Sequence, residues 1–125
     1  MNIIFDMDNT LTDELGATVR PGIINLLKKL QQDKHTLILW TNSNKERALY
    51  ILADHNLTRY FTRFIFRENY DPENKNVLKD IREVNGDIII DDDRNEIRFN
   101  RKNGKKGILI KPYRKGKSME EGELD

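Results

Sequence analysis

Short apolar runs alternate with helical patterns along this chain. Residues 2–5, 36–40, 87–90 and 107–110 contain apolar runs of strand length, each bounded by polar residues. An aromatic-rich stretch at residues 60–66 predicts a further short strand, third in chain order. Apolar residues recur at helical spacing over residues 23–30, 48–53 and 77–84, and the polar residues 94–100 form a fourth candidate helix. Five strands and four helices are therefore expected.

This alternation predicts an α/β fold. Strands that alternate with helices form a parallel sheet with right-handed crossovers and helices on both faces. We expect a three-layer, Rossmann-like sheet of about five strands in the order 5-4-1-2-3. Residues 1–112 should form one domain, and the charged residues 113–125 should form a flexible tail.

Clustered carboxylates follow two of the expected strands. Asp6 and Asp8 follow the first strand, and Asp91 and Asp92 follow the fourth. If these strands are neighbours, the acids converge at the carboxyl edge of the sheet, where such folds bind ligands. Crowded carboxylates of this kind favour a hard divalent cation, and Mg²⁺ fits best because it pairs carboxylates with phosphate.

Groups that bind anions are expected at the same edge. Thr41 and Asn42 lie between the second strand and the next helix, where a hydroxyl and free backbone N–H groups can bind phosphate. Lys79, expected near the start of a helix, supplies a positive charge, with Lys75 as its competitor. Asn42, Ser43 and Asn44 are each able to cap the following helix, and Ser43 is interpreted as a cap. Acid pair, hydroxyl, lysine and acid pair, in this order, indicate phosphoryl transfer.

Composition excludes several other chemistries. The chain of 125 residues has no cysteine, two histidines and a formal net charge of +1. Thiolate catalysis, disulfides and cysteine-bound zinc are thus excluded, and bulk electrostatic binding of nucleic acid or membrane is disfavoured. The first apolar run is too short for a signal peptide or a membrane span, so a soluble, cytoplasmic protein is expected.

The ordered motifs resemble those of a known superfamily. Asp6-Met7-Asp8-Asn9-Thr10, Thr41, Lys79 and Asp91-Asp92 are similar to the four motifs of the haloacid dehalogenase (HAD) superfamily. Residues 79–92 resemble the small phosphatases that act on the RNA polymerase C-terminal domain. Residues 60–61 and 66–70 resemble magnesium-dependent phosphatase-1 instead. The sequence does not rank these two subfamilies.

The resemblance implies a phosphatase with defined roles. Asp6 would be the nucleophile that forms an aspartyl-phosphate, Asp8 the general acid and base, and Thr10 the brace of their turn. Thr41, Asn42 and Lys79 would bind the phosphoryl group. The Mg²⁺ ligands would come from Asp6, Asp8, the Met7 carbonyl, and Asp91 or Asp92.

The chain has no room for the cap domain that many superfamily members carry. Only ten residues separate Thr10 from Pro21, and 37 residues separate Thr41 from Lys79. An open site suits a bulky substrate such as a phosphoprotein. The alternatives are a polynucleotide end, a small metabolite, or a non-catalytic HAD-like or receiver-like module that binds phosphate. The basic residues 98–117 are either an anion-docking surface or a solvated face, and the oligomeric state stays open.

Overall fold

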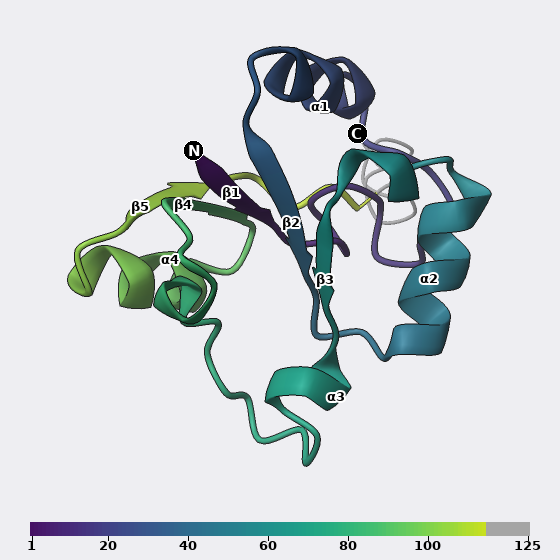
Figure 1. The fold of residues 1–125 in the computed structure, drawn as a ribbon. Coiled ribbons are helices and arrows are strands. Elements are labelled where there is room, and N and C mark those ends of the chain that lie inside the picture. The colour runs from purple at the N-terminus through teal and green to yellow at the C-terminus, as the bar shows by residue number, and fades with distance from the viewer. Residues whose placement is uncertain (115–125) are drawn as a thin grey trace, which may run out of the picture.

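A single parallel sheet of five strands organises the computed structural model, which describes residues 1–114. The strand order is β3-β2-β1-β4-β5, which confirms the predicted order (Figure 1). The strands are β1 (Asn2–Phe5), β2 (Thr36–Trp40), β3 (Arg63–Ile65), β4 (Ile88–Asp91) and β5 (Lys106–Leu109). The helices are α1 (Ile23–Gln32), α2 (Lys45–Asp54), α3 (Arg67–Tyr70) and α4 (Arg94–Lys102), with 3₁₀ turns η1 (Thr58–Tyr60) and η2 (Ile81–Val84).

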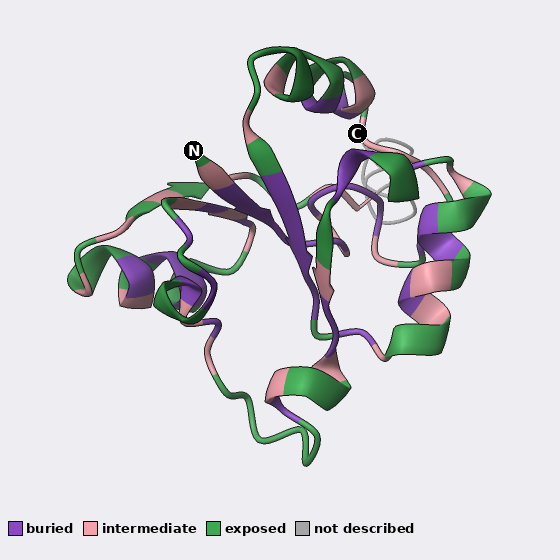
Figure 2. Ribbon diagram, viewed as in Figure 1, coloured by how far each residue is buried: buried purple, intermediate pink, exposed green. Residues whose placement is uncertain are grey.

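Apolar side chains of the central strands fill two separate cores, one on each face of the sheet. Ile3 and Phe5 of β1 pack with side chains of α1 and α2, whereas Ile4 packs with side chains of η2 and α4. Successive strand residues point to opposite faces, so buried residues in succession require cover on both sides. Figure 2 shows this burial along β1 and β2. The three-layer α/β architecture is confirmed.

The helix predicted over residues 77–84 is wrong in its first half. Residues 76–80 are irregular, and only Ile81–Val84 form a 3₁₀ turn. Asn76 has a φ of 59°, which is outside the helical region, and Val77 is 47% exposed. The backbone N–H groups of Lys79 and Ile81 donate to side chains of α4 instead of to helical carbonyls. Lys79 is therefore held on an irregular segment, not on a helix.

Three smaller expectations also change. Asn44, rather than Ser43, caps α2, because its side chain accepts a hydrogen bond of 2.8 Å from the Arg47 N–H. The segment after β3, which was expected to be a loop, contains the short helix α3. By contrast, the helix predicted over residues 94–100 is confirmed. Tyr113, assigned to the tail, donates its N–H to the Asn9 carbonyl at 2.8 Å. Most of the predicted tail, residues 115–125, lies outside the described residues.

The membrane prediction was tested on the same described part of the chain. No helix there is both long enough and apolar enough to cross a bilayer.

Candidate active site

The acids that follow β1 and β4 meet at the carboxyl edge of the sheet. Phe5 pairs with Ile90 in the parallel register, and the Asp6 N–H donates to the Ile90 carbonyl at 3.2 Å. Carboxylate oxygens of Asp6, Asp91 and Asp92 consequently lie within 4.8 Å of one another. They open onto a pocket of about 210 Å³ lined by Asp6, Asp8, Asn9, Thr41, Asn42, Lys79, Asp91, Asp92, Asp93 and Glu96. The predicted catalytic, phosphate-binding and metal-binding side chains all line this pocket, whereas Met7 and Thr10 do not.

Lys79 supplies the buried positive charge of this pocket. Its Nζ lies 2.9 Å from Asp6 Oδ1 and 2.9 Å from Asp91 Oδ2, and the residue is 3% exposed. Such charge-assisted bonds tie the ends of β1 and β4 together. Lys75, the competing candidate, has a largely exposed side chain that pairs with Glu73. The geometry thus places Lys79, and not Lys75, at the acids.

Burial makes the acids of the pocket hard to ionise. It raises the pKa of Asp6 to about 6 and that of Asp91 to about 6, although the Lys79 charge opposes both shifts. Burial also raises the pKa of Asp92. Burial alone would lower the pKa of Lys79, but the charges of Asp6, Asp91 and Glu96 raise it well above its usual value. Lys79 is therefore a permanent cation in a pocket with excess negative charge.

Asp8 lines the pocket but lies outside the three-carboxylate cluster. Its Oδ2 accepts from Arg47 Nη1 and its Oδ1 from Arg47 Nη2, each at 3.0 Å, so a guanidinium occupies both oxygens. The Met7 carbonyl is also engaged elsewhere, because it accepts the N–H groups of Thr10, Leu11 and Thr12 at 2.8–3.2 Å. Its lone pairs hold the turn together, and its role as a cation ligand stays a prediction.

The threonines of the motifs have different surroundings. Thr10 donates its hydroxyl toward Asp6 Oδ2 at 3.3 Å and lies 3.5 Å from Asp92 Oδ1, so it braces both acid-bearing segments. Thr41 Oγ1 accepts the Ser43 N–H at 3.0 Å. A hydroxyl carries a separate donor, so Thr41 can still donate to an oxygen in the pocket. Asn42 is exposed at the pocket rim.

Two side chains of α4 that the sequence reasoning missed hold the lysine segment in place. Glu96 Oε1 accepts the Lys79 N–H at 2.8 Å, and Asn100 Nδ2 donates to the Lys79 carbonyl at 2.8 Å. Burial raises the pKa of Glu96 to about 7 against the opposing Lys79 charge. Helical spacing from Asp92 and Asp93 was the signal available for Glu96, since residues three and four apart share a helix face.

Arg20 was also missed, and it braces the loop that follows β1. Its Nε donates to the Thr10 carbonyl at 2.7 Å, and its Nη2 donates to the Asn9 carbonyl at 2.8 Å. Its guanidinium lies 5.5 Å from the centre of the Tyr113 ring, close enough for a cation–π contact. Asn9 has a φ of 65°, so these contacts hold the loop in a left-handed turn.

The donor set at the strand ends fits a small divalent cation. Asp6, Asp91 and Asp92 offer hard carboxylate oxygens on one side of the pocket. Lys79 is the one cationic side chain that lines the pocket, within the described residues, against Asp6, Asp8, Asp91, Asp92, Asp93 and Glu96. Excess charge of this kind, with oxygen ligands alone, suits Mg²⁺ in preference to softer metals.

Solved structures share this fold at low sequence identity. A hydrolase from Streptococcus pneumoniae TIGR4 superposes with a TM-score of 0.71 at 13% identity, over 89% of this chain and 92% of that one. A HAD-superfamily hydrolase from Ehrlichia chaffeensis superposes with a TM-score of 0.67 at 16% identity, over 88% of this chain and 86% of that one. At such identities the likeness shows the fold alone.

Sequence comparison identifies the family. No curated protein sequence matches the chain. The family model of NLI interacting factor-like phosphatases matches residues 1–125. The chain therefore belongs to this family of phosphatases.

Proposed function

We propose that the protein is a Mg²⁺-dependent phosphomonoester hydrolase that acts through an aspartyl-phosphate on Asp6. The observation that carries this proposal is the buried Lys79, held 2.9 Å from both Asp6 and Asp91 at a pocket with excess negative charge. A lysine so placed keeps Asp6 fixed in one orientation, as a nucleophile requires. It also presents positive charge to an entering phosphate.

The pocket residues account for two steps. In the first, a carboxylate oxygen of Asp6 attacks phosphorus, the bond to the ester oxygen breaks, and Asp8 gives that oxygen a proton. In the second, water attacks the phosphorus of the aspartyl-phosphate, Asp8 takes a proton from the water, and Asp6 is released with inorganic phosphate. Thr41, Asn42 and Lys79 bind the phosphoryl oxygens throughout.

The cation belongs to the three-carboxylate cluster. Asp6, Asp91 and Asp92 would hold it, and it would offset their charge and withdraw electrons from the phosphoryl group. Asp91 is already bonded, through Oδ2 to Lys79 and through Oδ1 to the Asp93 N–H at 2.9 Å. Within residues 1–114, the Asp92 carboxylate accepts one hydrogen bond, from the Thr10 hydroxyl at 3.5 Å, so more of its lone pairs are available to a cation.

The pocket is proposed to receive a bulky substrate, with a phosphoprotein first. The loop between Thr10 and α1 is folded on itself, because the Asp13 carboxylate accepts the N–H groups of Leu15, Ala17 and Thr18. Only η1, β3 and α3 lie between α2 and the lysine segment. Neither insertion point therefore carries a cap, and binding energy must come from groups around an open rim.

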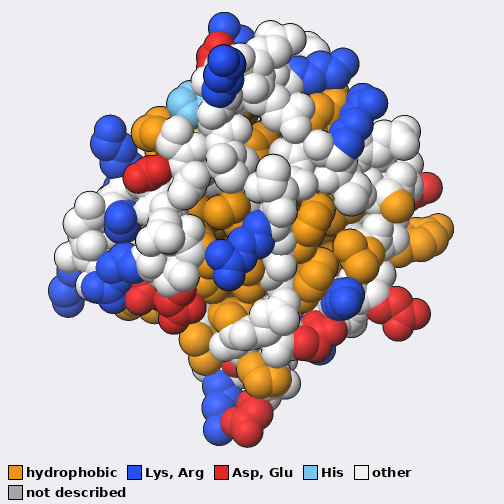
Figure 3. All heavy atoms as spheres, in the orientation of Figure 1, with side chains coloured by type: hydrophobic (Ala, Val, Ile, Leu, Met, Phe, Trp, Pro, Cys, Tyr) orange, Lys and Arg blue, Asp and Glu red, His pale blue; other side chains and the backbone are white. Residues whose placement is uncertain are grey.

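A polynucleotide end is the second candidate, because basic side chains gather over α4 (Figure 3). A groove of about 300 Å³ there is lined by Arg94, Ile97, Arg98, Arg101 and Leu109. Phosphates along such a groove would release counterions, so this mode predicts steep weakening of binding with salt.

Hydrolysis of p-nitrophenyl phosphate tests the activity. The full chain should turn it over with Mg²⁺, stop with chelator and recover when Mg²⁺ is restored. Brief reaction with ³²P-labelled substrate, followed by acid quenching, should leave label on Asp6. A full chain that is folded and inactive with Mg²⁺ would reject the proposal.

Substrate class is tested separately. Phosphopeptides, oligonucleotides phosphorylated at the 3′ or 5′ end, nucleotides and sugar phosphates should be compared by kcat/KM at two salt concentrations. We expect phosphopeptides to lead. An oligonucleotide that leads only at low salt would favour the α4 groove. A small metabolite hydrolysed a hundredfold better than every macromolecule would contradict the open-site argument.

A further inference from the structure

The carboxylate of Asp8 is held by an arginine from a different element. Arg47 lies in the first turn of α2, and its guanidinium makes two bonds of 3.0 Å to the two oxygens of Asp8. Among the described residues, no other side chain hydrogen-bonds the Asp8 carboxylate. Parallel bonds of this kind fix both the position and the plane of a carboxylate, which a single bond does not.

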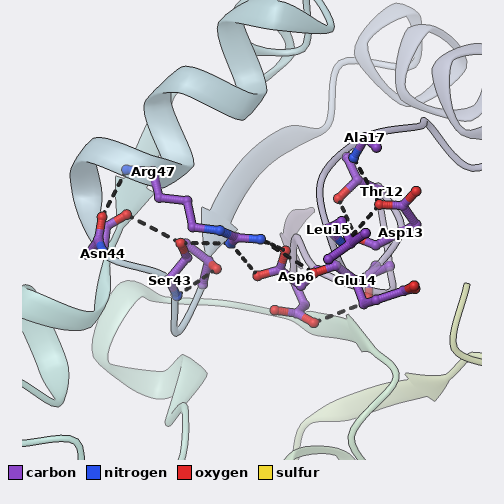
Figure 4. A network of polar contacts seen from close by, with 12 residues as sticks. Asp6, Thr12, Asp13, Glu14, Leu15, Ala17, Ser43, Asn44 and Arg47 are labelled. Carbon is purple, nitrogen blue, oxygen red and sulfur yellow. Dashed lines mark hydrogen bonds and ion pairs between the residues drawn. The ribbon is translucent and has the colours of Figure 1, made fainter. Parts of the chain in front are cut away.

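Arg47 is itself held in place. Its Nη1 donates to Ser43 Oγ at 3.0 Å and its Nη2 donates to the Glu14 carbonyl at 3.4 Å, while its backbone N–H donates to the capping Asn44. Figure 4 shows this side chain reaching from α2, past Ser43, toward the loop that follows β1. The side chains of Arg47 and Asp8 are 37% and 28% exposed, and of the two only Asp8 lines the pocket.

An ion pair at a protein surface usually contributes little, about 0–1 kcal/mol of stability. The location of this one gives it another role. Asp8 lines the pocket two residues after Asp6, yet it lies outside the cluster of Asp6, Asp91 and Asp92. A cation bound at that cluster would therefore leave Asp8 unrestrained, and Arg47 is the group that orients it.

We propose that Arg47 is a positioning residue that aims the Asp8 carboxylate at the leaving group. The inference rests on the proposed function, in which Asp8 protonates the ester oxygen. A carboxyl group that bonds one guanidinium through one lone pair on each oxygen keeps a second lone pair on each, and one of these can carry the proton that passes to the ester oxygen. A lysine at position 47 would replace the two parallel bonds of the guanidinium by a single point charge. It would therefore restore only part of the orientation of the Asp8 carboxylate.

The test compares two aryl esters of similar shape. Phenyl phosphate releases a weakly acidic phenol that needs a proton, whereas p-nitrophenyl phosphate releases a stable phenolate that does not. General acid catalysis contributes about 10²–10⁴-fold, so loss of orientation should have a large effect on phenyl phosphate. For Arg47→Met we expect kcat/KM to fall about tenfold or more on phenyl phosphate and less than about threefold on p-nitrophenyl phosphate. Arg47→Lys should lie between Arg47→Met and the wild type.

Two further measurements separate orientation from phosphate binding and from folding. Inhibition by inorganic phosphate should be unchanged in Arg47→Met, and adding this change to Asp8→Asn should cause no further loss on either ester. Arg82→Met is the matched control, because Arg82 makes two bonds to Asp80, at 2.9 and 2.8 Å, away from the pocket. It should match the wild type on both esters, and the thermal midpoint of each variant reports its folding.

Several outcomes would overturn the inference. Equal losses on both esters with weaker inhibition by phosphate would make Arg47 a phosphate ligand. A further loss in the Asp8→Asn background would make it independent of Asp8. Full activity of Arg47→Met on phenyl phosphate would make the pair a surface contact. Absence of hydrolysis by the wild type would instead reject the proposed function, and the inference with it.

Discussion

Glu96 offers the sharpest test of the electrostatics around Lys79. The residue is 6% exposed, and its Oε1 accepts the Lys79 N–H at 2.8 Å. Burial raises its pKa from 4.5 to about 7, although the Lys79 charge opposes the shift. Glu96→Gln keeps a carbonyl oxygen that can accept the same hydrogen bond, and it removes the ionisation.

The sign and size of the effect follow from linkage. The folded chain binds the Glu96 proton more tightly than the unfolded chain, so ionisation of Glu96 lowers the free energy of unfolding as pH rises from 4.5 to about 7. A shift of one pKa unit corresponds to about 1.4 kcal/mol, so the full loss is about 3 kcal/mol. Asp6 and Asp91 also have raised pKa values, near 6, and their losses have the same sign. Those losses are present in both proteins and cancel in the comparison.

Urea unfolding in chelator at a series of pH values from 5 to 8 measures this difference. The free energy of unfolding of Glu96→Gln should be close to that of wild type at pH 5. As pH rises it should exceed the wild-type value by an increasing amount, up to about 3 kcal/mol at pH 8. Glu83→Gln, which changes an exposed acid on η2, is the control and should follow the wild type. Parallel pH curves for Glu96→Gln and wild type would show that Glu96 ionises normally, and the description of this buried carboxyl would be wrong.

Three other predictions test the nucleophile, the metal ligands and the packing. Asp6→Asn should abolish turnover of p-nitrophenyl phosphate and leave the thermal midpoint at or above that of wild type, because an amide cannot attack phosphorus. Asp92→Asn should raise the Mg²⁺ concentration for half-maximal activity at least tenfold, and Asp91→Asn should do the same, because each change removes one of the three clustered carboxylates. Gly86→Ala should lower the free energy of unfolding in urea by about 1–3 kcal/mol, since a Cβ there would lie 2.5 Å from Ile4 Cδ1.

Local sequence was enough to predict the sheet and the acids. The apolar runs at residues 2–5 and 36–40 are buried on both faces, and such runs read as central parallel strands. The acids at the ends of the first and fourth strands can form one site only if these two strands are neighbours in the sheet. Placing them side by side led to the predicted strand order. Asp6 and Asp91 came together because each lies at a strand end, so their meeting depended only on topology, whereas Lys79 reaches them from the irregular segment before η2.

Contacts that depend on side-chain direction were not predictable in the same way. Arg47 is one of many charged residues on the outer part of a helix, and no spacing rule links it to Asp8, which is 39 residues away. The Met7 carbonyl appeared available in the sequence because a turn's internal hydrogen bonds cannot be read from it. Lys79 was placed on a helix because residues 77–84 match a helical period, but tertiary contacts overrode that local preference.

The tertiary contacts of this irregular segment explain how it can hold the buried Lys79 rigidly. A helix would satisfy the backbone groups of Lys79 internally, whereas an irregular segment leaves them open and, in a buried position, must find partners for them. Glu96 and Asn100, one turn apart on α4, bind the Lys79 N–H and carbonyl respectively, and Asn100 also accepts the Ile81 N–H at 3.1 Å. The position of Lys79 is thus set by α4, whose first turn follows directly from Asp91 and Asp92. One short helix therefore fixes Lys79 relative to the acids whose charge it offsets. A substitution that disturbs the packing of α4 should consequently shift the Lys79 backbone and, with it, the ammonium group in the pocket.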